Sequence, residues 1–432
     1  MTTAPGAGPS RLRNPIRRYF AVLGPGLVTG AADDDPSGIA TYSIAGASLG
    51  YSLLWTAGFT FPLMAAIQLV CARIGLVTGR GLAGALRQHY PRPLLYFACS
   101  LLLVVNVFNI AADLSGMADA VEMLTGLPSH ASIPLFGGFL LLVTVYTSYG
   151  TFAKYLKWLT AVLFAYVVAA FLAKPDWHAA LRATVVPTIR WDFEWMTTFL
   201  GVVGTTISPY LFFWQASHEV AEEKAKGRTT VTQRRGATAE ELGDARLDVI
   251  TGMLFSNVVM YFIMLTTAAT LYRGGHTSIE SSRQAAEALR PLAGDAAYLL
   301  FTLGIVGTGL LAVPVLAGSA SYAVAELFRW RTGLDLRFRQ AWRFYVVLGA
   351  AIVGGIVLDV LGINPLRMLF LSAVLNGLLA PPLLVLVMLV GNNRKIMGRH
   401  TNGVWLNTFG WAAAAVMTAA AIVFVLGLIR AS

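Results

Sequence analysis

Charged residues are scarce in this sequence. Asp, Glu, Lys and Arg make up 12% of its 432 residues, whereas hydrophobic residues make up 56%. Soluble domains carry about twice that charged fraction. The apolar residues form continuous blocks of roughly 20, the length of helix that crosses a hydrocarbon core. Because these blocks do not alternate with polar residues, the composition excludes a soluble fold and predicts an all-α membrane protein.

Redox and catalytic signatures are also scarce. The two cysteines, Cys71 and Cys99, lie in apolar surroundings, so no disulfide framework is indicated. The segment 218–222 (His-Glu-Val-Ala-Glu) resembles a zinc-protease signature but lacks its second histidine. No nucleophile motif or phosphate-binding loop is found, so we expect neither an enzyme nor a cofactor. All six histidines fall in predicted loops or at helix ends, which argues against a histidine-based metal site among the helices.

The apolar blocks predict about eleven membrane spans. A tail at 1–19 precedes a first five-span unit (20–173), a second five-span unit (195–390) and a last span (404–429). The individual spans are expected at 20–46, 51–74, 93–124, 132–149, 155–173, 195–220, 247–270, 296–327, 342–358, 365–390 and 404–429. The polar segments 221–245 and 272–295 are expected to be solvated connections, the second with an amphipathic stretch at 281–289.

The basic residues predict the orientation of the chain. If the N-terminus is cytoplasmic, 24 of the 32 Lys and Arg residues fall in cytoplasmic segments. That bias agrees with the positive-inside rule and places the C-terminus outside the cell. The net charge of +10 is therefore explained by topology in the cell membrane, and we expect the lipid bilayer, not nucleic acid, as a partner.

The first span contains residues that do not suit a continuous helix. Asp33, Asp34 and Asp35 are followed directly by Pro36, with Gly38 two residues later. An ionised carboxylate at the bilayer centre costs about 2.5–3.5 kcal/mol on insertion scales, so such residues indicate function. We expect the helix to be unwound near Asp35–Gly38, leaving free carbonyl groups that a cation can bind. The alternative is that the three acids lie at the outer end of a short span.

The sixth span is interrupted in a similar way. Pro209 lies at its centre, preceded by Ser208 and by hydroxyl and glycine residues, which predicts unwinding near Thr205–Pro209. A lone proline often only kinks a span. Here the two interruptions are five spans apart, as expected for two inverted repeats of five helices. Paired interruptions of this kind indicate the substrate site of a transporter.

The chain resembles the natural resistance-associated macrophage protein (Nramp) family of divalent-metal transporters. Gly-Pro-Gly at 24–26, Asp35-Pro36, the central Pro209, Asp113 in the third span and the segment 393–398 (Asn-Arg-Lys-Ile-Met-Gly) carry the resemblance, which spans nearly the whole chain. It implies a LeuT-type fold of two inverted five-helix repeats plus one extra helix. It also implies that Asp35 binds the transported metal; the neighbouring Asp34 is expected as a second carboxylate if the end of the first half-helix directs it to the site.

The metal site departs from the family pattern. The family's Asp-Pro-Gly-Asn has become Asp-Pro with Ser37 and Gly38, so the ligating asparagine is missing. The family's Met-Pro-His has become Ser208-Pro209-Tyr210, which removes a thioether and an imidazole. Thr205 is at the position whose backbone carbonyl binds metal in the family. In these respects the chain is similar to Nramp-related magnesium transporters.

The residues that move protons in the family are also reduced. In the third span only Asp113 remains as an acid, because Asn106 and Gly116 stand at the other two acidic positions. Asp113 and Asn106 are candidates for a proton or polar relay, although Asp113 can equally serve as a structural hydrogen-bond partner. In the tenth span the family's glutamine has become Ala373, with Asn376 one turn away as a residue lining the site.

Together these substitutions indicate a hard cation as substrate. An oxygen-only set from Asp34, Asp35, Ser37, Ser208 and the Thr205 carbonyl suits Mg²⁺, which keeps several waters, better than a soft transition metal. We therefore expect a monomeric transporter of Mg²⁺ and Mn²⁺ with weak or absent proton coupling, whose site is lined by Gly38, Tyr210 and Asn376. Two alternatives stay open. One is a transporter for a small organic cation or zwitterion, held by aromatic residues such as Tyr42, Phe212 and Trp214; the other is a passive channel.

Overall fold

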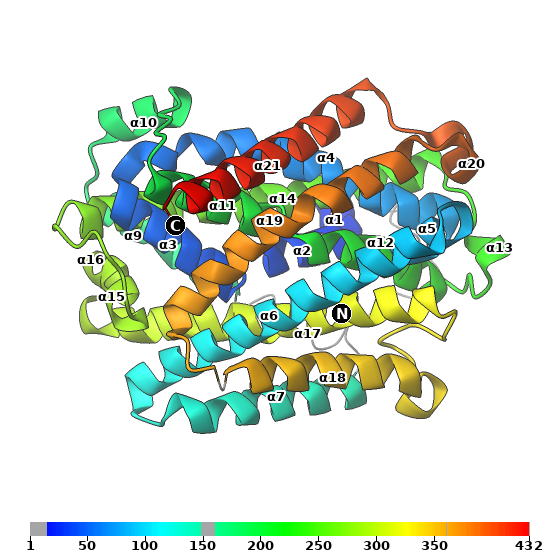
Figure 1. The fold of residues 1–432 in the computed structure, drawn as a ribbon, viewed down its shortest axis with the longest axis horizontal. Coiled ribbons are helices and arrows are strands. Elements are labelled where there is room, and N and C mark those ends of the chain that lie inside the picture. The colour runs from blue at the N-terminus through cyan, green and yellow to red at the C-terminus, as the bar shows by residue number, and fades with distance from the viewer. Residues whose placement is uncertain (1–14, 148–159, 360, 432) are drawn as a thin grey trace.

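The computed structural model describes residues 15–147, 160–359 and 361–431. Within these residues the regular structure is helical, without a strand, and nine helices are long and apolar enough to cross a membrane. The prediction of an all-α membrane protein is confirmed. The long helices α6 (Arg92–Thr125) and α17 (Ala297–Leu327) lie side by side, and α7 (Ser129–Tyr146) and α18 (Trp342–Asp359) cover them along one edge of the molecule (Figure 1).

Most of the described helices follow the expected spans to within a few residues, but the helix Ala239–Thr267 begins well before the expected start at 247, within the segment expected to be a connection. The first span is divided into α2 (Pro25–Asp33) and α3 (Pro36–Leu49), and the sixth into α11 (Phe193–Thr206) and α12 (Pro209–Ala225). The other long helices are α4 (Trp55–Thr78), α14 (Ala239–Thr267), α19 (Pro365–Asn392) and α21 (Val404–Ala431). The start of the fifth span, expected at 155–173, lies outside the described residues; its remainder forms η3 (Thr160–Leu163) and α9 (Phe164–Leu172).

Short helices connect the long ones. The two segments expected to be solvated connections are partly helical, and the amphipathic stretch at 281–289 forms α15 and η5. The connecting elements are α1 (Pro15–Val22), η2 (Gly50–Leu53), α5 (Leu82–His89), α10 (Trp177–Val185), α13 (Val231–Arg234), η4 (Ala268–Tyr272), α15 (Ser282–Ala286), η5 (Glu287–Leu289), α16 (Arg290–Ala293), η6 (Gly294–Ala296), η7 (Phe338–Gln340), α20 (Arg394–Met397) and η8 (Gly398–His400).

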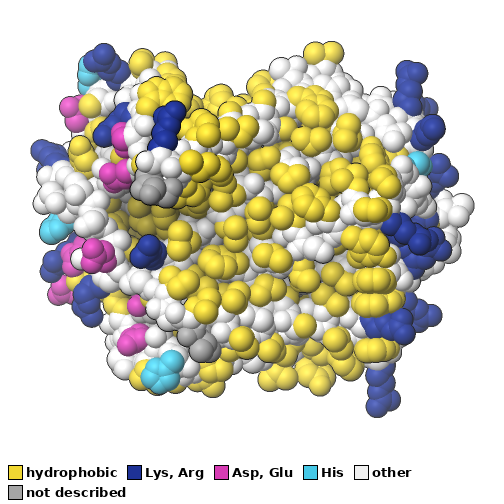
Figure 2. Space-filling view, in the orientation of Figure 1, with side chains coloured by type: hydrophobic (Ala, Val, Ile, Leu, Met, Phe, Trp, Pro, Cys, Tyr) yellow, Lys and Arg dark blue, Asp and Glu magenta, His cyan; other side chains and the backbone are white. Residues whose placement is uncertain are grey.

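The surface divides into an apolar band and two charged ends. Hydrophobic side chains cover the middle of the molecule in Figure 2, as expected for a surface in contact with lipid. Lys and Arg gather at the right-hand end, which carries α5, α13 and α20 in Figure 1, whereas the left-hand end carries acidic and basic side chains together. Helices α7, α18 and α21 are the least buried of the spans, so they lie at the periphery.

The broken helices are packed closely against unbroken ones. A Cβ atom on Gly30 of α2 would lie 2.1 Å from the carbonyl oxygen of Gly252 on α14, and a Cβ on Gly204 of α11 would lie 2.2 Å from the carbonyl oxygen of Ala373 on α19. Only glycine fits at these positions, because any side chain would push the helix backbones apart. These contacts hold the two breaks at the centre of the molecule.

Candidate functional site

The first break lies between α2 and α3. Helix α2 ends at Asp33, Asp34 has a non-helical backbone, and Asp35 is extended with φ −67° and ψ 172°. Oδ1 of Asp35 accepts a hydrogen bond of 2.7 Å from the Gly38 amide and so caps the N-terminus of α3. The predicted break is confirmed, but its predicted extent to Gly38 is wrong. Proline suits the first position of a helix, where its missing N–H group is not needed, so Pro36 begins α3.

The second break lies at Ile207 and Ser208, inside the range predicted for it. Thr205 still belongs to α11, and Pro209 begins α12 just as Pro36 begins α3. The Ser208 hydroxyl donates to the backbone oxygens of Thr205 at 2.6 Å and Gly204 at 3.2 Å. It thereby satisfies carbonyl groups at the open end of α11 that have no helical partner.

Asp33 and Asp34 share one partner on α14. The Ser256 hydroxyl lies 2.6 Å from Oδ2 of Asp33 and 3.2 Å from Oδ1 of Asp34. The other oxygen of each carboxylate is buried without a hydrogen-bond partner. Both side chains have a relative exposure of 0%. The two carboxylates therefore present unsatisfied acceptors inside the protein.

Tyr210 joins the two breaks. Its hydroxyl lies 2.7 Å from the Ala32 carbonyl oxygen and 3.2 Å from Oδ2 of Asp35. The tyrosine is on the first turn of α12, whereas Ala32 and Asp35 flank the break in the first span. Tyr210 stands where the Nramp family pattern has a histidine, so a phenol replaces the imidazole and contacts Asp35 directly.

Asp113, on α6, is a fourth buried carboxylate. Its exposure is 0%, neither of its oxygens has a hydrogen-bond partner among the described residues, and it lies near Asp35. No ion pair within the described residues includes any of the four carboxylates of Asp33, Asp34, Asp35 and Asp113. Buried carboxylates are costly unless a positive charge or hydrogen bonds compensate them, so this arrangement favours a cation.

Side-chain ligands alone do not complete a metal site here. Among the described residues, no three His, Cys, Asp or Glu side chains converge closely enough to hold a metal ion. A cation at the breaks must therefore bind backbone or hydroxyl oxygens, or waters, in addition to carboxylates. Mg²⁺ suits such a site because it commonly binds one or two carboxylates and keeps several waters.

Three predicted site residues have their polar groups engaged elsewhere. The Ser37 hydroxyl contacts the Leu369 carbonyl and Ser372, both on α19. The Asn106 amide donates to the Leu316 carbonyl at 2.8 Å. Asn376 and Asn109 form a reciprocal amide pair, with N···O distances of 2.8 and 3.1 Å. The structure therefore does not bring these three polar groups to the carboxylates.

Gly38 and Thr205 face each other across the breaks. A Cβ on Gly38 would lie 3.2 Å from the Asp33 carbonyl oxygen and 3.4 Å from Oγ1 of Thr205. That spacing leaves little free volume at Gly38. The Thr205 hydroxyl is buried without a partner, so its side chain, and not only its carbonyl, is available to the site.

Several polar residues near the site were not predicted. Ser256 gives no signal in the sequence, because a single serine in an apolar span is common. The Thr29 hydroxyl donates to Gln215 at 2.5 Å, and Gln215 donates to Glu219 at 2.9 Å. This chain leads from α2 along α12, and the four-residue spacing of Gln215 and Glu219 in an apolar segment was an available signal.

One expectation about histidine is wrong. His218 lies within α12, not in a loop or at a helix end, and its ring stacks on Trp214 with centroids 5.0 Å apart. The apolar block was expected to end near residue 220, but α12 continues to Ala225. A helix continues past its apolar stretch when charged residues with good helix propensity, such as Glu and Lys, follow it.

The fold and the site define a multi-pass membrane transporter with two broken helices. The structure superposes on that of a manganese transporter from Eremococcus coleocola with a TM-score of 0.78 at 18% identity, covering 96% of this chain and 88% of that one. It also superposes on Mhp1, a nucleobase-cation-symport-1 family transporter in a closed conformation, with a TM-score of 0.57 at 17% identity and coverage of 94% and 90%. The expected LeuT-type fold is confirmed.

The sequence gives the family. The model of the family "Natural resistance-associated macrophage protein-like" matches residues 26–427, so the chain belongs to the Nramp family. A divalent metal cation transporter, MntH of Klebsiella pneumoniae, is 28% identical over 401 residues, which are 92% of each chain. The predicted family is thereby confirmed.

Proposed function

We propose that this protein is a secondary transporter of divalent metal cations, Mg²⁺ and Mn²⁺, with weak or absent proton coupling. One observation carries the proposal: Asp33, Asp34, Asp35 and Asp113 are buried around two helix breaks, and none has a basic partner among the described residues. A divalent cation supplies the missing charge. The names of the relatives, a divalent metal cation transporter and a manganese transporter, support the same substrate class.

The ligand chemistry supports a hard cation. We assign Asp35 as the dominant charge, with Asp34, the Thr205 carbonyl and Ser208 as further oxygen donors and Ser37 and Asn376 in a lining role. The residue at the family's thioether position, Ser208, offers only oxygen. Removing sulfur removes the preference for transition metals over Mg²⁺. Retained waters would complete a coordination shell that the side chains alone do not fill.

The surroundings of Asp113 support weak proton coupling. In this chain Asn106 is committed to a backbone carbonyl and Tyr210 is a phenol, so neither exchanges protons readily near neutral pH. Asp113 is left as a single carboxylate without a neighbouring titratable relay at positions 106 and 116. We propose that it adds charge to the cation site and does not carry a stoichiometric proton flux.

The packing of the aromatic residues speaks against an organic substrate. Phe212 and Trp214 are buried in the hydrophobic core, and the Tyr42 hydroxyl contacts Thr206 at 3.2 Å. An aromatic cage for a cation requires ring faces turned toward an open site. The rings of Phe212 and Trp214 pack against other core side chains instead.

The distribution of charge supports the proposed orientation. The end of the molecule rich in Lys and Arg carries α5, α13 and α20, and we place it in the cytoplasm (Figures 1 and 2). The N-terminus is then cytoplasmic and the C-terminus outside, and the protein acts as a monomer in the cell membrane.

Calorimetry on the purified protein tests the substrate class. We expect saturable binding of Mg²⁺ and Mn²⁺ that is lost in Asp35→Asn, and no binding of a panel of organic amines and zwitterions. Binding of an organic compound without any metal binding would contradict the proposal and favour the organic-substrate alternative.

A further inference from the structure

A pocket of about 840 Å³ lies at the basic end of the molecule, away from the helix breaks. It is formed where α5, α13 and the ends of α4, α12 and α17 meet. Five Lys and Arg side chains and one acidic side chain line it, together with His89: Arg80, Arg87, Lys224, Arg234, Arg329 and Glu326. A smaller pocket of about 280 Å³ shares Arg80 and His89 and adds Arg235 and Lys395.

The single acid does not neutralise the five cations. Oε1 and Oε2 of Glu326 accept hydrogen bonds from the amides of Gly81 at 3.0 Å and Gly84 at 2.8 Å, at the N-terminus of α5. Within the part of the chain that the structure describes, none of the five basic side chains forms an ion pair. The pocket therefore has a surplus of positive charge.

Neutral carbonyl groups hold several of the cations in place. Nζ of Lys224 donates to the Thr332 carbonyl at 3.0 Å, and Nη1 of Arg87 donates to the backbone carbonyl of Glu326 at 3.0 Å. Nη1 of Arg234 donates to two backbone carbonyls at 2.8 Å. These bonds position the charges without cancelling them, which prepares a site for an anion.

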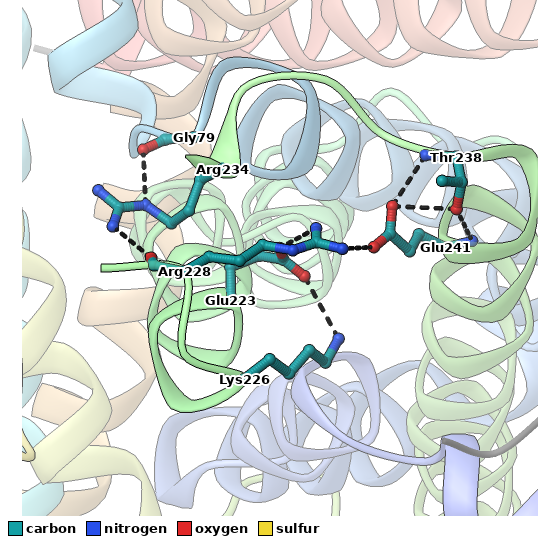
Figure 3. A network of polar contacts seen from close by, with 7 residues as sticks. All are labelled: Gly79, Glu223, Lys226, Arg228, Arg234, Thr238 and Glu241. Atoms are coloured by element: carbon teal, nitrogen blue, oxygen red, sulfur yellow. Dashed lines mark hydrogen bonds and ion pairs between the residues drawn. The ribbon is translucent and has the colours of Figure 1, made fainter. Parts of the chain in front are cut away.

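A neighbouring arginine shows the contrast. Arg228 is paired with both Glu223 and Glu241, and Lys226 also pairs with Glu223, whereas Arg234 reaches only carbonyl oxygens such as that of Gly79 (Figure 3). The nearby acids Glu223 and Glu241 therefore pair with Arg228 and Lys226, and neither of them lines the pocket. The pKa of Arg234 is lowered by burial and then by repulsion from Arg80, as expected where positive charges crowd together.

One further feature points to an absent ligand. Nε of Arg87 is buried and has no hydrogen-bond partner among the described residues. Arg329 itself is placed by the end of α17, where the Trp330 amide donates to the Ala325 carbonyl at 2.8 Å and the backbone of Arg329 is left-handed, as is common in a helix C-cap. This cap brings Arg329, Trp330 and Thr332 to the pocket.

We propose that this pocket binds a multiply charged phosphate group, of a soluble phosphate compound or of a lipid headgroup. Guanidinium groups bind phosphate oxygens in pairs, and several of them can share one group. A volume of about 840 Å³ exceeds what a lone phosphate ion fills and suits a phosphate ester or polyphosphate. Because Lys224 lies on α12, the ligand would tie the inner half of the broken sixth helix to α5 and α17.

Binding of tripolyphosphate to the purified full-length protein tests the proposal. The measurement is titration calorimetry in phosphatidylcholine nanodiscs with EDTA present, so that no divalent metal bridges the ligand. We expect saturable binding to the unmodified protein. Arg329→Gln should weaken it about tenfold or more, because it removes a charge-assisted contact. Arg87→Gln should also weaken it.

Arg331→Gln is the matched control. Arg331 has the same charge and lies two residues from Arg329, but it does not line the pocket. Its substitution should leave tripolyphosphate binding within about twofold of the unmodified protein. Absence of saturable binding to the unmodified protein, or equal weakening by Arg329→Gln and Arg331→Gln, would overturn the proposal.

Nanodiscs that contain phosphatidic acid, whose phosphate monoester headgroup can carry more than one negative charge, separate the two sources of phosphate. Tripolyphosphate binding that persists in them identifies a soluble phosphate compound as the ligand, and binding that disappears identifies the headgroup. Either result supports the phosphate site. The assay reports binding without metal or transport, so its outcome is independent of the proposed transport function.

Discussion

At the scale of single residues, we propose that Asp35 combines a structural role with the binding of the cation. Its carboxylate caps α3 through the Gly38 amide and also contacts Tyr210. Asparagine is equally good at a helix N-terminus, so Asp35→Asn removes the charge while retaining the cap. We expect metal transport in proteoliposomes to fall about 100-fold or more, with an unchanged melting temperature, because the dominant charge on the cation is lost. Transport within about threefold of the unmodified protein would contradict the assignment.

Asp113 gives a second test at this scale. Because neither of its oxygens has a hydrogen-bond partner among the described residues, Asp113→Asn should cost little stability, yet it should weaken Mg²⁺ binding about tenfold by calorimetry. Asp119→Asn, on the same helix but half-buried, is the control and should bind Mg²⁺ normally. A loss of thermal stability in Asp113→Asn without a change in affinity would assign Asp113 a purely structural role.

The residue at position 208 should set metal selectivity. Ser208→Met restores a soft ligand, so we expect the ratio of Mn²⁺ to Mg²⁺ affinity to rise about tenfold in competition assays. Ser208→Ala separates this effect from the loss of the hydroxyl, which contacts only backbone oxygens among the described residues. An equal ratio in the methionine and alanine variants would show that sulfur at this position does not determine selectivity.

At the scale of helices, α2 is attached to α14 through its N-terminus. The Asp248 carboxylate accepts hydrogen bonds from the amides of Gly24, Gly26 and Leu27 at 2.9, 2.6 and 3.0 Å. These amides belong to the open end of the helix, where a negative charge is also favoured by the helix dipole. This contact, with the glycine packing beside it, attaches the N-terminal half of the first span to α14 next to the carboxylates.

Asp248→Asn should loosen that closure. The substitution replaces charge-assisted hydrogen bonds, a loss of about 1–3 kcal/mol, and should favour displacement of α2. The measurement is alkylation of a cysteine introduced at Thr29, since Cys71 and Cys99 are buried, and we expect labelling from the cytoplasmic side to rise about tenfold. Asp244→Asn is the control: Asp244 lies one turn earlier on α14, its only ion pair among the described residues is with the exposed Arg18, and its substitution should not change labelling. Equal labelling in both variants would rule out the role of Asp248.

The sequence predicts the positions of the two helix breaks better than their exact bounds or the residues that contact them. Proline next to acids or hydroxyls located both breaks, because proline cannot continue a helix in the middle of a span. The first and last residues of each break were harder to predict. Pro36 and Pro209 begin helices, so the unwound residues come before them. Partners such as Ser256 and Asn109 could not be predicted, because their contacts depend on how helices far apart in the sequence pack.

At the scale of the whole molecule, the structure is occluded. Asp33, Asp34 and Asp35 have relative exposures of 0%, 0% and 1%, so neither side of the membrane reaches them in this conformation. Transport then requires a conformational change that opens a path to them, as movement of the halves of the broken helices would do.

We propose that a divalent metal moves through this protein without protons. Proteoliposomes with a pH-sensitive dye and a Mg²⁺ indicator inside, given an inward Mg²⁺ gradient, measure both fluxes at once. We expect Mg²⁺ uptake that Asp35→Asn abolishes, with no internal acidification beyond that of liposomes without protein. Acidification that rises in proportion to Mg²⁺ uptake would contradict the uncoupled mechanism, and the absence of any Mg²⁺ or Mn²⁺ uptake would contradict metal transport itself.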